Sequence, residues 1–272
     1  MRVLSWLLFI FVVTLFSGAK AQTTKQFKLP NGLKEISGLA VASPNTVYAH
    51  NDEHAIVYEI DVASGEVLSA FALGGKTVKG DFEGIAVSQG RVYLITSGGR
   101  IYEAPIGEHR ERVRYNTYDT GVGSLCEIEG LITAPDAESE FLILCKTPRR
   151  EDLAGKLLIY RWPHVDRAPV SEPWRSVELS SFLSAEDAAT FRPSGIEWDP
   201  ISGAFILISA RNHLLVRFDP ETSEAEAIPM NAKAHNQAEG IARLSNGVFV
   251  ISDEGNRAGP GTLTWYQSAP FD

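Results

Sequence analysis

Short apolar runs separated by turn residues fill the chain from about residue 25 to residue 266. Each run has the length of a β-strand, and turns such as SQG at 88–90 and SGG at 97–99 supply the glycine that a tight hairpin needs. The pattern predicts strands at 36–41, 46–50, 55–61, 67–73, 82–87, 91–96, 100–104, 112–118, 128–133, 140–146, 156–162, 174–179, 194–198, 204–209, 213–218, 224–230, 239–244, 247–252 and 262–266.

One motif recurs through these strands: a glycine followed by Ile or Leu and preceded by a small or acidic residue. Its copies are EISGLAV at 35–41, DFEGIAV at 81–87, EIEGLIT at 127–133, PSGIEWD at 193–199 and AEGIARL at 238–244. Three of the steps between the glycines are 46, 46 and 45 residues, a period typical of propeller blades. The sequence therefore predicts an all-β fold, a five-bladed β-propeller of four-stranded blades.

The remaining step, from Gly130 to Gly195, is 65 residues long and needs one insertion. Residues 180–191 suit this role, because Ser184 followed by Glu186 and Asp187 is typical of a capped helical turn. A six-bladed ring, in which the insertion forms a degenerate sheet, is the alternative.

The last unit is one strand short, whereas the segment 25–30 is a strand candidate without a unit of its own. We expect this N-terminal strand to complete the last blade and close the ring, since closure removes an exposed sheet edge. Residues 22–272 are then expected to form a single β-propeller domain.

Residues 1–21 have the pattern of a secretory signal peptide: Arg2, an apolar run over 3–16, and AKA at 19–21 as the cleavage site. A membrane anchor is the alternative, but about 14 apolar residues are fewer than the roughly 20 that a spanning helix needs. We expect a periplasmic or secreted protein with no membrane span after cleavage.

The chain is acidic, with a formal net charge of -9. Cleavage after Ala21 would remove Arg2 and Lys20 and so lower this charge by two. An acidic surface repels phosphate backbones, and no basic stretch with interleaved aromatic residues occurs, so nucleic acid is excluded as a partner class.

The two cysteines, Cys126 and Cys145, flank a predicted hairpin. Export would place them where disulfides persist, and pairing of the two runs would bring them opposite one another. We expect a disulfide; two separate buried thiols are the alternative.

The residue before each motif glycine should line the central channel, because the first strand of every propeller blade does so. These residues are Ser37, Glu83, Glu129, Ser194 and Glu239. Three carboxylates in a narrow channel repel one another and need protons, a nearby Lys or Arg, or a hard cation. No Lys or Arg occurs in this layer, and carboxylate and hydroxyl oxygens suit Ca²⁺, so we expect a calcium site at Glu83, Glu129 and Glu239. Water and backbone amides around these side chains are the alternative.

Polar residues at the ends of the second strands should emerge on the same face. With the two serines of the channel layer they form a predicted ligand-binding face of Ser37, Asn51, Ser194, Arg211, His235 and Asp253. Such residues are also common in solvated turns.

The sequence contains no nucleophile elbow, P-loop, dinucleotide-binding glycine motif, zinc-protease motif or EF-hand loop. The first functional hypothesis is an exported calcium-binding module that binds an unidentified small molecule or protein. The second is a metal-dependent hydrolase of lactones or phosphate esters, with His235 or a metal-bound water as base. The third is a structural scaffold that uses its rim for protein contacts.

The motifs quoted above, together with AHNDEHAIVYEID from residue 49 and FVISDEGN from residue 249, resemble the SdiA-regulated family of exported bacterial propellers. The resemblance covers nearly all of the chain after residue 21. It implies a five-bladed propeller distantly similar to NHL-repeat proteins, with a calcium site and no established catalytic activity, and it places the metal ligands at Glu83, Glu129 and Glu239. The acids before the glycines also resemble metal ligands of lactonase-type propellers, although the asparagine positions of those enzymes are Ser or Glu here.

Overall fold

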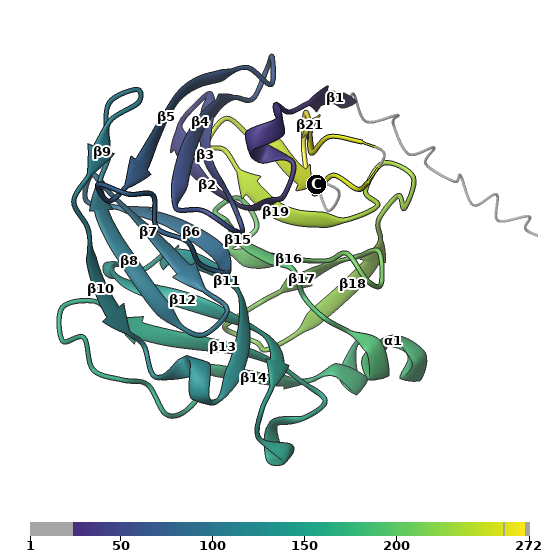
Figure 1. Cartoon of the computed structure of the whole chain (residues 1–272). Coiled ribbons are helices and arrows are strands. Elements are labelled where there is room, and N and C mark those ends of the chain that lie inside the picture. The colour runs from purple at the N-terminus through teal and green to yellow at the C-terminus, as the bar shows by residue number, and fades with distance from the viewer. Residues whose placement is uncertain (1–23, 258, 270–272) are drawn as a thin grey trace, which may run out of the picture.

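The computed structural model describes residues 24–257 and 259–269, and the expected signal peptide lies outside them. Five sheets, mainly antiparallel, stand around a central axis like the blades of a propeller (Figure 1). The prediction of an all-β, five-bladed propeller is confirmed. The sheets of the described residues number five, so the six-bladed alternative is wrong.

Blades one and two come from the first 120 residues. Their strands are β2 (Ile36–Ser43), β3 (Thr46–Asn51), β4 (Ile56–Asp61), β5 (Val67–Leu73) and β9 (Arg112–Val113) in blade one, and β6 (Phe82–Ser88), β7 (Arg91–Thr96), β8 (Arg100–Pro105) and β10 (Asn116–Asp119) in blade two. The single strand expected at 112–118 is split, because residues 112–113 pair in parallel with β5 of the preceding blade. This exchange covers the outer edge of blade one.

Blades three and four follow the same order from the axis outward. Their strands are β11 (Cys126–Ala134), β12 (Ala137–Pro148), β13 (Lys156–Pro163) and β14 (Arg175–Glu178) in blade three, and β15 (Gly195–Asp199), β16 (Ala204–Ser209), β17 (Leu214–Phe218) and β18 (Ala225–Pro229) in blade four. The insertion between these blades contains the helix α1 (Ala185–Thr190), where the Ser184 hydroxyl accepts the backbone N–H of Asp187 at 3.1 Å. The predicted capped turn is therefore confirmed.

Short helical turns connect several of the strands. Four 3-10 turns span Asn31–Leu33, Val122–Ser124, Glu151–Leu153 and Leu179–Ser181. No helix within the described residues is long and apolar enough to cross a membrane.

Blade five is completed by the start of the chain, as predicted. It contains β19 (Ala238–Arg243), β20 (Phe249–Asp253) and β21 (Thr262–Tyr266), and β1 (Thr24–Lys28) pairs antiparallel with β21. Phe27 of β1 also lies against Gly65, which has a φ of +71° in the β4–β5 turn of blade one. A side chain at Gly65 would collide with Phe27, so this glycine lets blade five pack closely against blade one.

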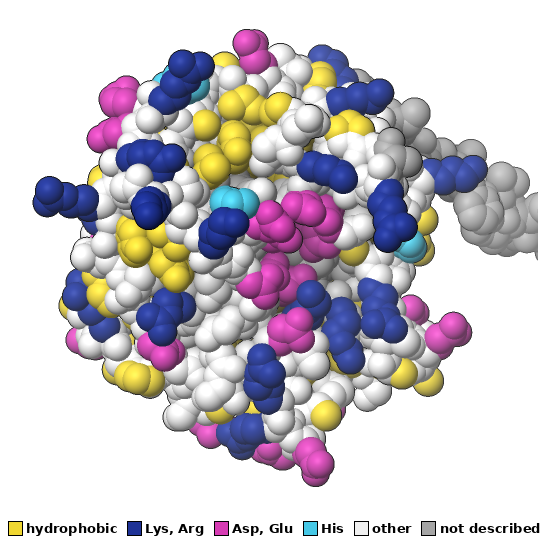
Figure 2. Space-filling view, in the orientation of Figure 1, with side chains coloured by type: hydrophobic (Ala, Val, Ile, Leu, Met, Phe, Trp, Pro, Cys, Tyr) yellow, Lys and Arg dark blue, Asp and Glu magenta, His cyan; other side chains and the backbone are white. Residues whose placement is uncertain are grey.

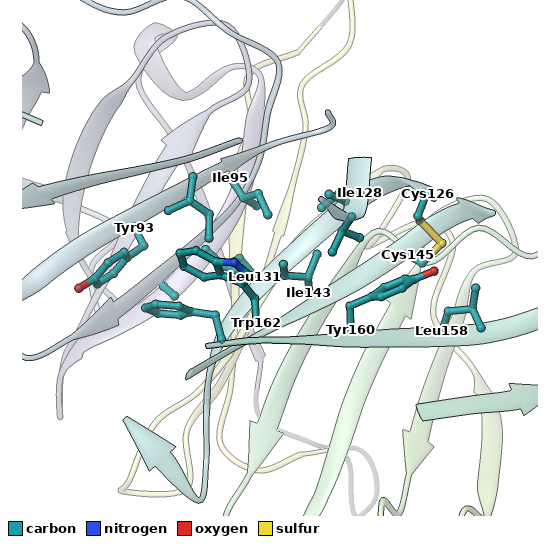
Figure 3. Close-up of a cluster of buried hydrophobic side chains, with 14 of the residues drawn as sticks. Tyr93, Ile95, Cys126, Ile128, Leu131, Ile143, Cys145, Leu158, Tyr160 and Trp162 are labelled. Atoms are coloured by element: carbon teal, nitrogen blue, oxygen red, sulfur yellow. A yellow bond between two sulfur atoms is a disulfide. The ribbon is translucent and has the colours of Figure 1, made fainter. Parts of the chain in front are cut away.

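Large side chains fill the spaces between neighbouring blades. Figure 3 shows the cluster between blades two and three, to which Tyr93 of β7 and Trp162 of β13 contribute. The rings of Tyr93 and Phe141 lie 4.4 Å apart, and Phe141 in turn stacks on Trp162. Burial of each such ring stabilises the fold by about 1.5–3 kcal/mol, so the blades are held together mainly by these clusters.

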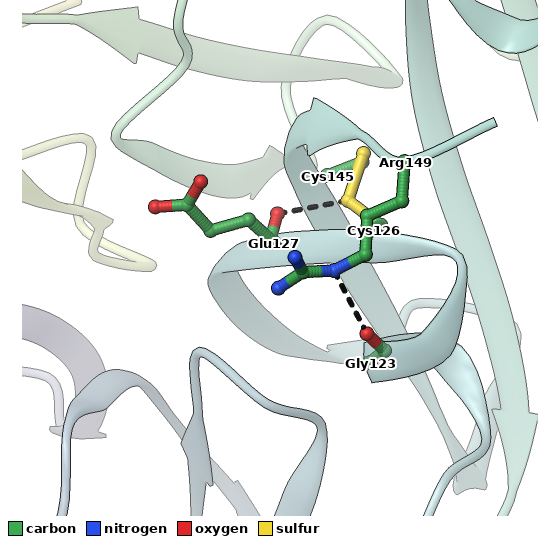
Figure 4. The surroundings of a disulfide bond; sticks show 5 residues. All are labelled: Gly123, Cys126, Glu127, Cys145 and Arg149. Carbon is green, nitrogen blue, oxygen red and sulfur yellow. Dashed lines mark hydrogen bonds between the residues drawn. A yellow bond between two sulfur atoms is a disulfide. The ribbon is translucent and has the colours of Figure 1, made fainter. Parts of the chain in front are cut away.

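The predicted disulfide is confirmed: Cys126 and Cys145 are bonded, with their Cα atoms 5.8 Å apart (Figure 4). The two residues are not directly opposite: Cys126 pairs with Pro148, and a bulge that leaves out Lys146 of β12 places Cys145 across from Ile128. The bridge thus links β11 and β12 diagonally. Arg149 Nε donates to the Gly123 carbonyl at 3.1 Å beside it.

The motif glycines lie where the first strands of neighbouring blades approach most closely. A Cβ at Gly84 would lie 2.6 Å from the Leu131 backbone nitrogen, and one at Gly195 would lie 2.7 Å from the Glu239 carbonyl oxygen. These contacts are to backbone, which cannot move aside as a flexible side chain can. At Gly84 and Gly195 the glycine is therefore a requirement of close strand approach in the narrowest part of the channel.

Candidate functional site

One end of the channel opens into a cavity of about 200 Å³ whose walls are mostly acidic. We call it the acid mouth. It is lined by Glu35, Ile36, Ser37, Asp52, Glu83, Glu129, Lys146, Gln237, Glu239 and Glu254. Figure 2 shows acidic side chains gathered over the centre of the ring on this face, with Lys and Arg side chains around them.

A β-bulge before each of four motif glycines directs the side chains of this layer. The strand register shifts between Phe82 and Gly84, between Ile128 and Gly130, and between Ala238 and Gly240. The residue left out of each pairing is the glutamate, and in β2 the same shift leaves out Ser37. A bulge turns its extra residue away from the regular alternation of a strand, so the repeat brings one acidic side chain from each of three blades to the acid mouth.

Burial and mutual repulsion make ionisation of these glutamates costly. Burial, and then the charge of Glu129, raise the pKa of Glu83 to about 9. Burial raises the pKa of Glu129 to about 7 although Lys146 favours its ionised form. Burial and the charge of Glu129 also raise the pKa of Glu239 well above its ordinary value. The mouth thus holds protonatable acids around neutral pH.

Lys146 supplies a positive charge that the repeat analysis did not place in this layer. Its Nζ donates to Glu129 Oε1 at 2.8 Å and lies 3.8 Å from Glu127 Oε1. Burial disfavours its charge, but the charge and hydrogen bond of Glu129, together with the charges of Glu83 and Glu127, outweigh this effect, and the pKa of Lys146 is raised. The expectation that no Lys or Arg reaches the glutamates was therefore wrong, because a long side chain from the end of β12 extends into a layer built by the first strands.

Two carboxylate oxygens of the acid mouth have no hydrogen-bond partner within the described part of the chain. Ser37 Oγ donates to Glu83 Oε2 at 3.2 Å, but Glu129 Oε2 and Asp52 Oδ1 are buried and have no hydrogen-bond partner among the described residues. Buried carboxylate oxygens are normally paired, so these two mark a place where water or a cation is expected.

The predicted ligand-binding face is only partly assembled. Ser37 lines the acid mouth, and Arg211 is exposed. Asn51 Oδ1 accepts the backbone N–H of His54 at 2.9 Å, and Ser194 is buried with its hydroxyl donating to the Ala238 carbonyl at 2.6 Å. Asn51 and Ser194 therefore stabilise local structure rather than line the cavity.

His235 and Asp253 lie inside blade five. His235 Nδ1 is 2.7 Å from Asp253 Oδ2, and its Nε2 is bonded to the Tyr266 hydroxyl. His235 and Asp253 are both buried, and neither lines the acid mouth. His235 precedes β19 and Asp253 ends β20, positions that suggested exposure at the mouth, but pairing with each other satisfies both polar groups within the fold.

The cavity also includes residues that the sequence prediction did not select. Glu35 begins the first motif copy, and Gln237 comes directly before the last one, so the extended motif carries a signal for both. Asp52 directly follows β3 and Glu254 directly follows β20, the second strands of blades one and five. The sequence analysis expected second-strand ends on this face but selected the neighbours Asn51 and Asp253, and only the structure shows which residue of each pair lines the cavity.

The residues of the acid mouth have the chemistry of a hard-cation site. The donor set is all oxygen, from three glutamates and Ser37; one oxygen of Glu129 and one of the neighbouring Asp52 lack partners among the residues that the structure describes. Within the described part of the chain, however, no three Asp, Glu, His or Cys side chains are already close enough to hold a metal ion. The donors fit Ca²⁺ in type, and the side chains would have to move closer together to coordinate it.

No protein-family model matches the chain. No curated protein matches it either.

Solved propellers are similar in fold. A luciferin-regenerating enzyme has a TM-score of 0.57 at 8% identity, over 92% of this chain and 96% of the enzyme. A PQQ-bound aldose sugar dehydrogenase from Streptomyces coelicolor has a TM-score of 0.54 at 13% identity, over 90% and 98%. A glutaminyl cyclase from Myxococcus xanthus has a TM-score of 0.54 at 14% identity, over 90% and 96%. At these identities the likeness shows the propeller fold alone.

Proposed function

We propose that this chain is an exported binding module whose acid mouth takes Ca²⁺ and, through it, a ligand or partner at the centre of the ring. The observation that carries the proposal is the convergence of Glu83, Glu129 and Glu239 around a single lysine. Two buried carboxylate oxygens of the mouth, on Glu129 and Asp52, lack partners. The disulfide agrees with an oxidising compartment, as does the expected signal peptide.

The three glutamates and Ser37 would hold the ion. A divalent cation would neutralise the carboxylates and offer a positive centre to an anionic or carbonyl oxygen of the ligand. Glu83, whose pKa is raised to about 9, would release its proton on binding, and the raised pKa of Glu239 favours proton release in the same direction. The sequence resemblance to the SdiA-regulated family supports the same function.

The test is calorimetric titration of chelator-treated protein with CaCl₂, together with thermal unfolding. We expect heat of binding and a rise in melting temperature. Glu239→Gln should weaken binding about tenfold or more, a loss of about 1.4 kcal/mol. Glu221→Gln, at an exposed residue after β17, is the matched control. Absence of both heat and stabilisation in the wild type would exclude the calcium site.

A hydrolase that uses the same cation is less well supported. His235, its candidate base, is buried between Asp253 and Tyr266 and does not line the acid mouth. A metal-bound water would then have to serve as the base. Turnover of a lactone or phosphoester panel with Ca²⁺, abolished by Glu83→Gln, would favour the hydrolase over the binding module.

A further inference from the structure

The opposite end of the channel contains a second cavity with a different lining. Its volume is about 160 Å³, and it is lined by residues 39–41 of β2, 85–87 of β6, 132–133 of β11 and Glu197 of β15. Apart from Thr133 and Glu197, these residues are all Leu, Ile, Val or Ala. We call this cavity the apolar mouth. It presents one carboxylate within largely hydrophobic walls.

The two mouths are separated by the narrow ring of motif glycines. The channel there has a volume of only about 10 Å³, roughly enough for one water molecule. A solute that enters the apolar mouth therefore cannot reach Glu83, Glu129 or Glu239. The apolar mouth is a separate site, and an inference about it does not depend on calcium binding at the other end.

Glu197 has hydrogen-bond donors but no cation beside it. Its Oε1 accepts the backbone N–H of Trp198 at 2.7 Å, and its Oε2 accepts that of Arg243 at 3.4 Å. No Lys, Arg or His within the described part of the chain forms an ion pair with it. The guanidinium of Arg243 instead contacts Asp199 Oδ1 at 3.2 Å. Each carboxylate oxygen keeps a lone pair that these bonds do not use.

A metal ion does not suit this arrangement. Ca²⁺ takes six to eight oxygen ligands and Mg²⁺ needs an octahedron, whereas the side chains of the apolar mouth offer one carboxylate and one hydroxyl. The hydroxyl of Thr133 is already engaged, since it donates to the Val87 carbonyl at 2.9 Å. An ammonium group needs only one carboxylate and one or two further acceptors, and hydrophobic walls favour an alkyl chain attached to it.

We propose that the apolar mouth is a binding site for a small primary alkylammonium ion, with Glu197 as counter-ion and the aliphatic walls around the alkyl chain. The first strands are edge strands of their sheets, and unpaired backbone carbonyls on such an edge can accept the remaining N–H groups. The modest cavity limits the ligand to a few carbon atoms.

The charged groups near Glu197 give the site a defined pH response. Asp199, on the same strand, is held by Arg243 of β19, and the residues of β2, β6 and β11 at this cavity do not titrate. Burial raises the pKa of Glu197 to about 8, against the lowering effect of its two backbone bonds. Glu197 is therefore largely protonated at pH 7 and ionised at pH 9. An alkylammonium remains charged at both, because its pKa is close to the value of about 10.4 for lysine.

The experiment is calorimetric titration of the full protein with n-butylammonium chloride at pH 7 and pH 9. The ionised fraction of Glu197 rises about tenfold over this interval, so we expect binding about tenfold tighter at pH 9. 1-Butanol, which has a similar chain and no charge, should bind much more weakly. Glu197→Gln should abolish the pH dependence and weaken binding at pH 9 about tenfold or more, whereas Glu221→Gln should do neither.

Calcium binding at the acid mouth serves as a control for butylammonium binding at the apolar mouth, because each substitution should affect only its own cavity. Glu239→Gln should leave butylammonium binding unchanged, and Glu197→Gln should leave calcium binding unchanged. No butylammonium binding at pH 9, equal binding of 1-butanol, or full binding by folded Glu197→Gln would each overturn the proposal. If Glu197→Gln does not fold, the pH dependence of the wild type and the comparison with 1-butanol decide the matter.

Discussion

Lys146 Nζ lies 2.8 Å from Glu129 Oε1 and is the only ammonium group that lines the acid mouth within the described residues. The lysine comes from the end of β12 and the glutamate from the bulge of β11, so the pair joins two strands of one blade. It neutralises one of three converging glutamates. Two acids are left to protons or to a cation.

Removal of this ammonium group should strengthen calcium binding. In Lys146→Met no positive charge repels the incoming cation, and Glu129 is freed as a ligand. We expect affinity to rise about tenfold, or by ~1.4 kcal/mol, in calorimetric titration. Lys156→Met is the control, because Lys156 lies 3.5 Å from Glu178 in the same blade and outside the acid mouth. Unchanged or weaker binding in Lys146→Met would mean that the cation does not use Glu129.

The closeness of the first strands should make the motif glycines intolerant of a methyl group. In Gly84→Ala the new Cβ would meet the Leu131 nitrogen at 2.6 Å and the Gly130 carbonyl carbon at 2.9 Å. We expect a loss of about 1–3 kcal/mol in chemical denaturation. Gly75→Ala has nothing within 4 Å of its Cβ and should change stability by less than about 0.5 kcal/mol. Equal effects of the two substitutions would contradict the proposed role of the glycine.

Ring closure by β1 should be needed for a monodisperse protein. A chain that begins at residue 29 lacks the partner of β21 and the contact of Phe27 with Gly65. The free edge of β21 should then pair between molecules. Size-exclusion chromatography with light scattering should show self-association, and thermal unfolding should show a lower midpoint, relative to a chain that begins at Thr24. A stable monomer of the shorter chain would show that the ring stays closed and monomeric without β1.

The disulfide should stabilise the third blade chiefly through the unfolded chain. Cys126 and Cys145 are 19 residues apart, and closure of a loop of that size is worth roughly 3 kcal/mol in the chain-entropy model. The double variant Cys126→Ser and Cys145→Ser should lose about that free energy of unfolding. Addition of reductant to the wild type should produce the same decrease only slowly, because both cysteines are buried. A double variant as stable as the wild type would contradict a stabilising role of the disulfide.

Acidification should destabilise the protein through His50. This side chain is fully buried, and burial lowers its pKa to about 4, below the ordinary value of 6.5. The unfolded chain therefore binds a proton that the folded chain refuses, and stability is lost as pH falls from about 6.5 to about 4. The loss reaches about 3 kcal/mol at the lower limit.

The glutamates of the acid mouth have raised pKa values, so their protonation stabilises the folded protein as pH falls. Over part of this range their effect therefore opposes that of His50. The contribution of His50 is isolated as the difference in free energy of unfolding between the wild type and His50→Gln. That difference should shrink by about 3 kcal/mol between pH 7 and pH 4. A difference that does not depend on pH would remove His50 from the explanation.

The candidate site was predictable as far as the repeat could define it. Equivalent positions before Gly84, Gly130 and Gly240 must occupy equivalent places around an axis, so the convergence of their glutamates follows from the period. Lys146 was not predictable in the same way, because it belongs to one blade only and reaches the mouth by the length and direction of its side chain. Glu197 was overlooked for a related reason, since it lies two residues after its glycine and faces the other end of the channel.

The sequence by itself determined the number of blades, the position of the insertion, the strand that closes the ring and the pairing of the two cysteines. These features depend on the repeat period, on local turn chemistry and on the positions of the two cysteines around a hairpin, all of which are written in short stretches of chain. Only the tertiary structure decided which polar side chains are free for a ligand. His235 and Asp253 satisfy each other inside blade five, whereas Glu129 and Asp52 keep oxygens without partners at the acid mouth. Hydrogen-bond satisfaction is a property of residues brought together from distant parts of the chain, and no local pattern records it.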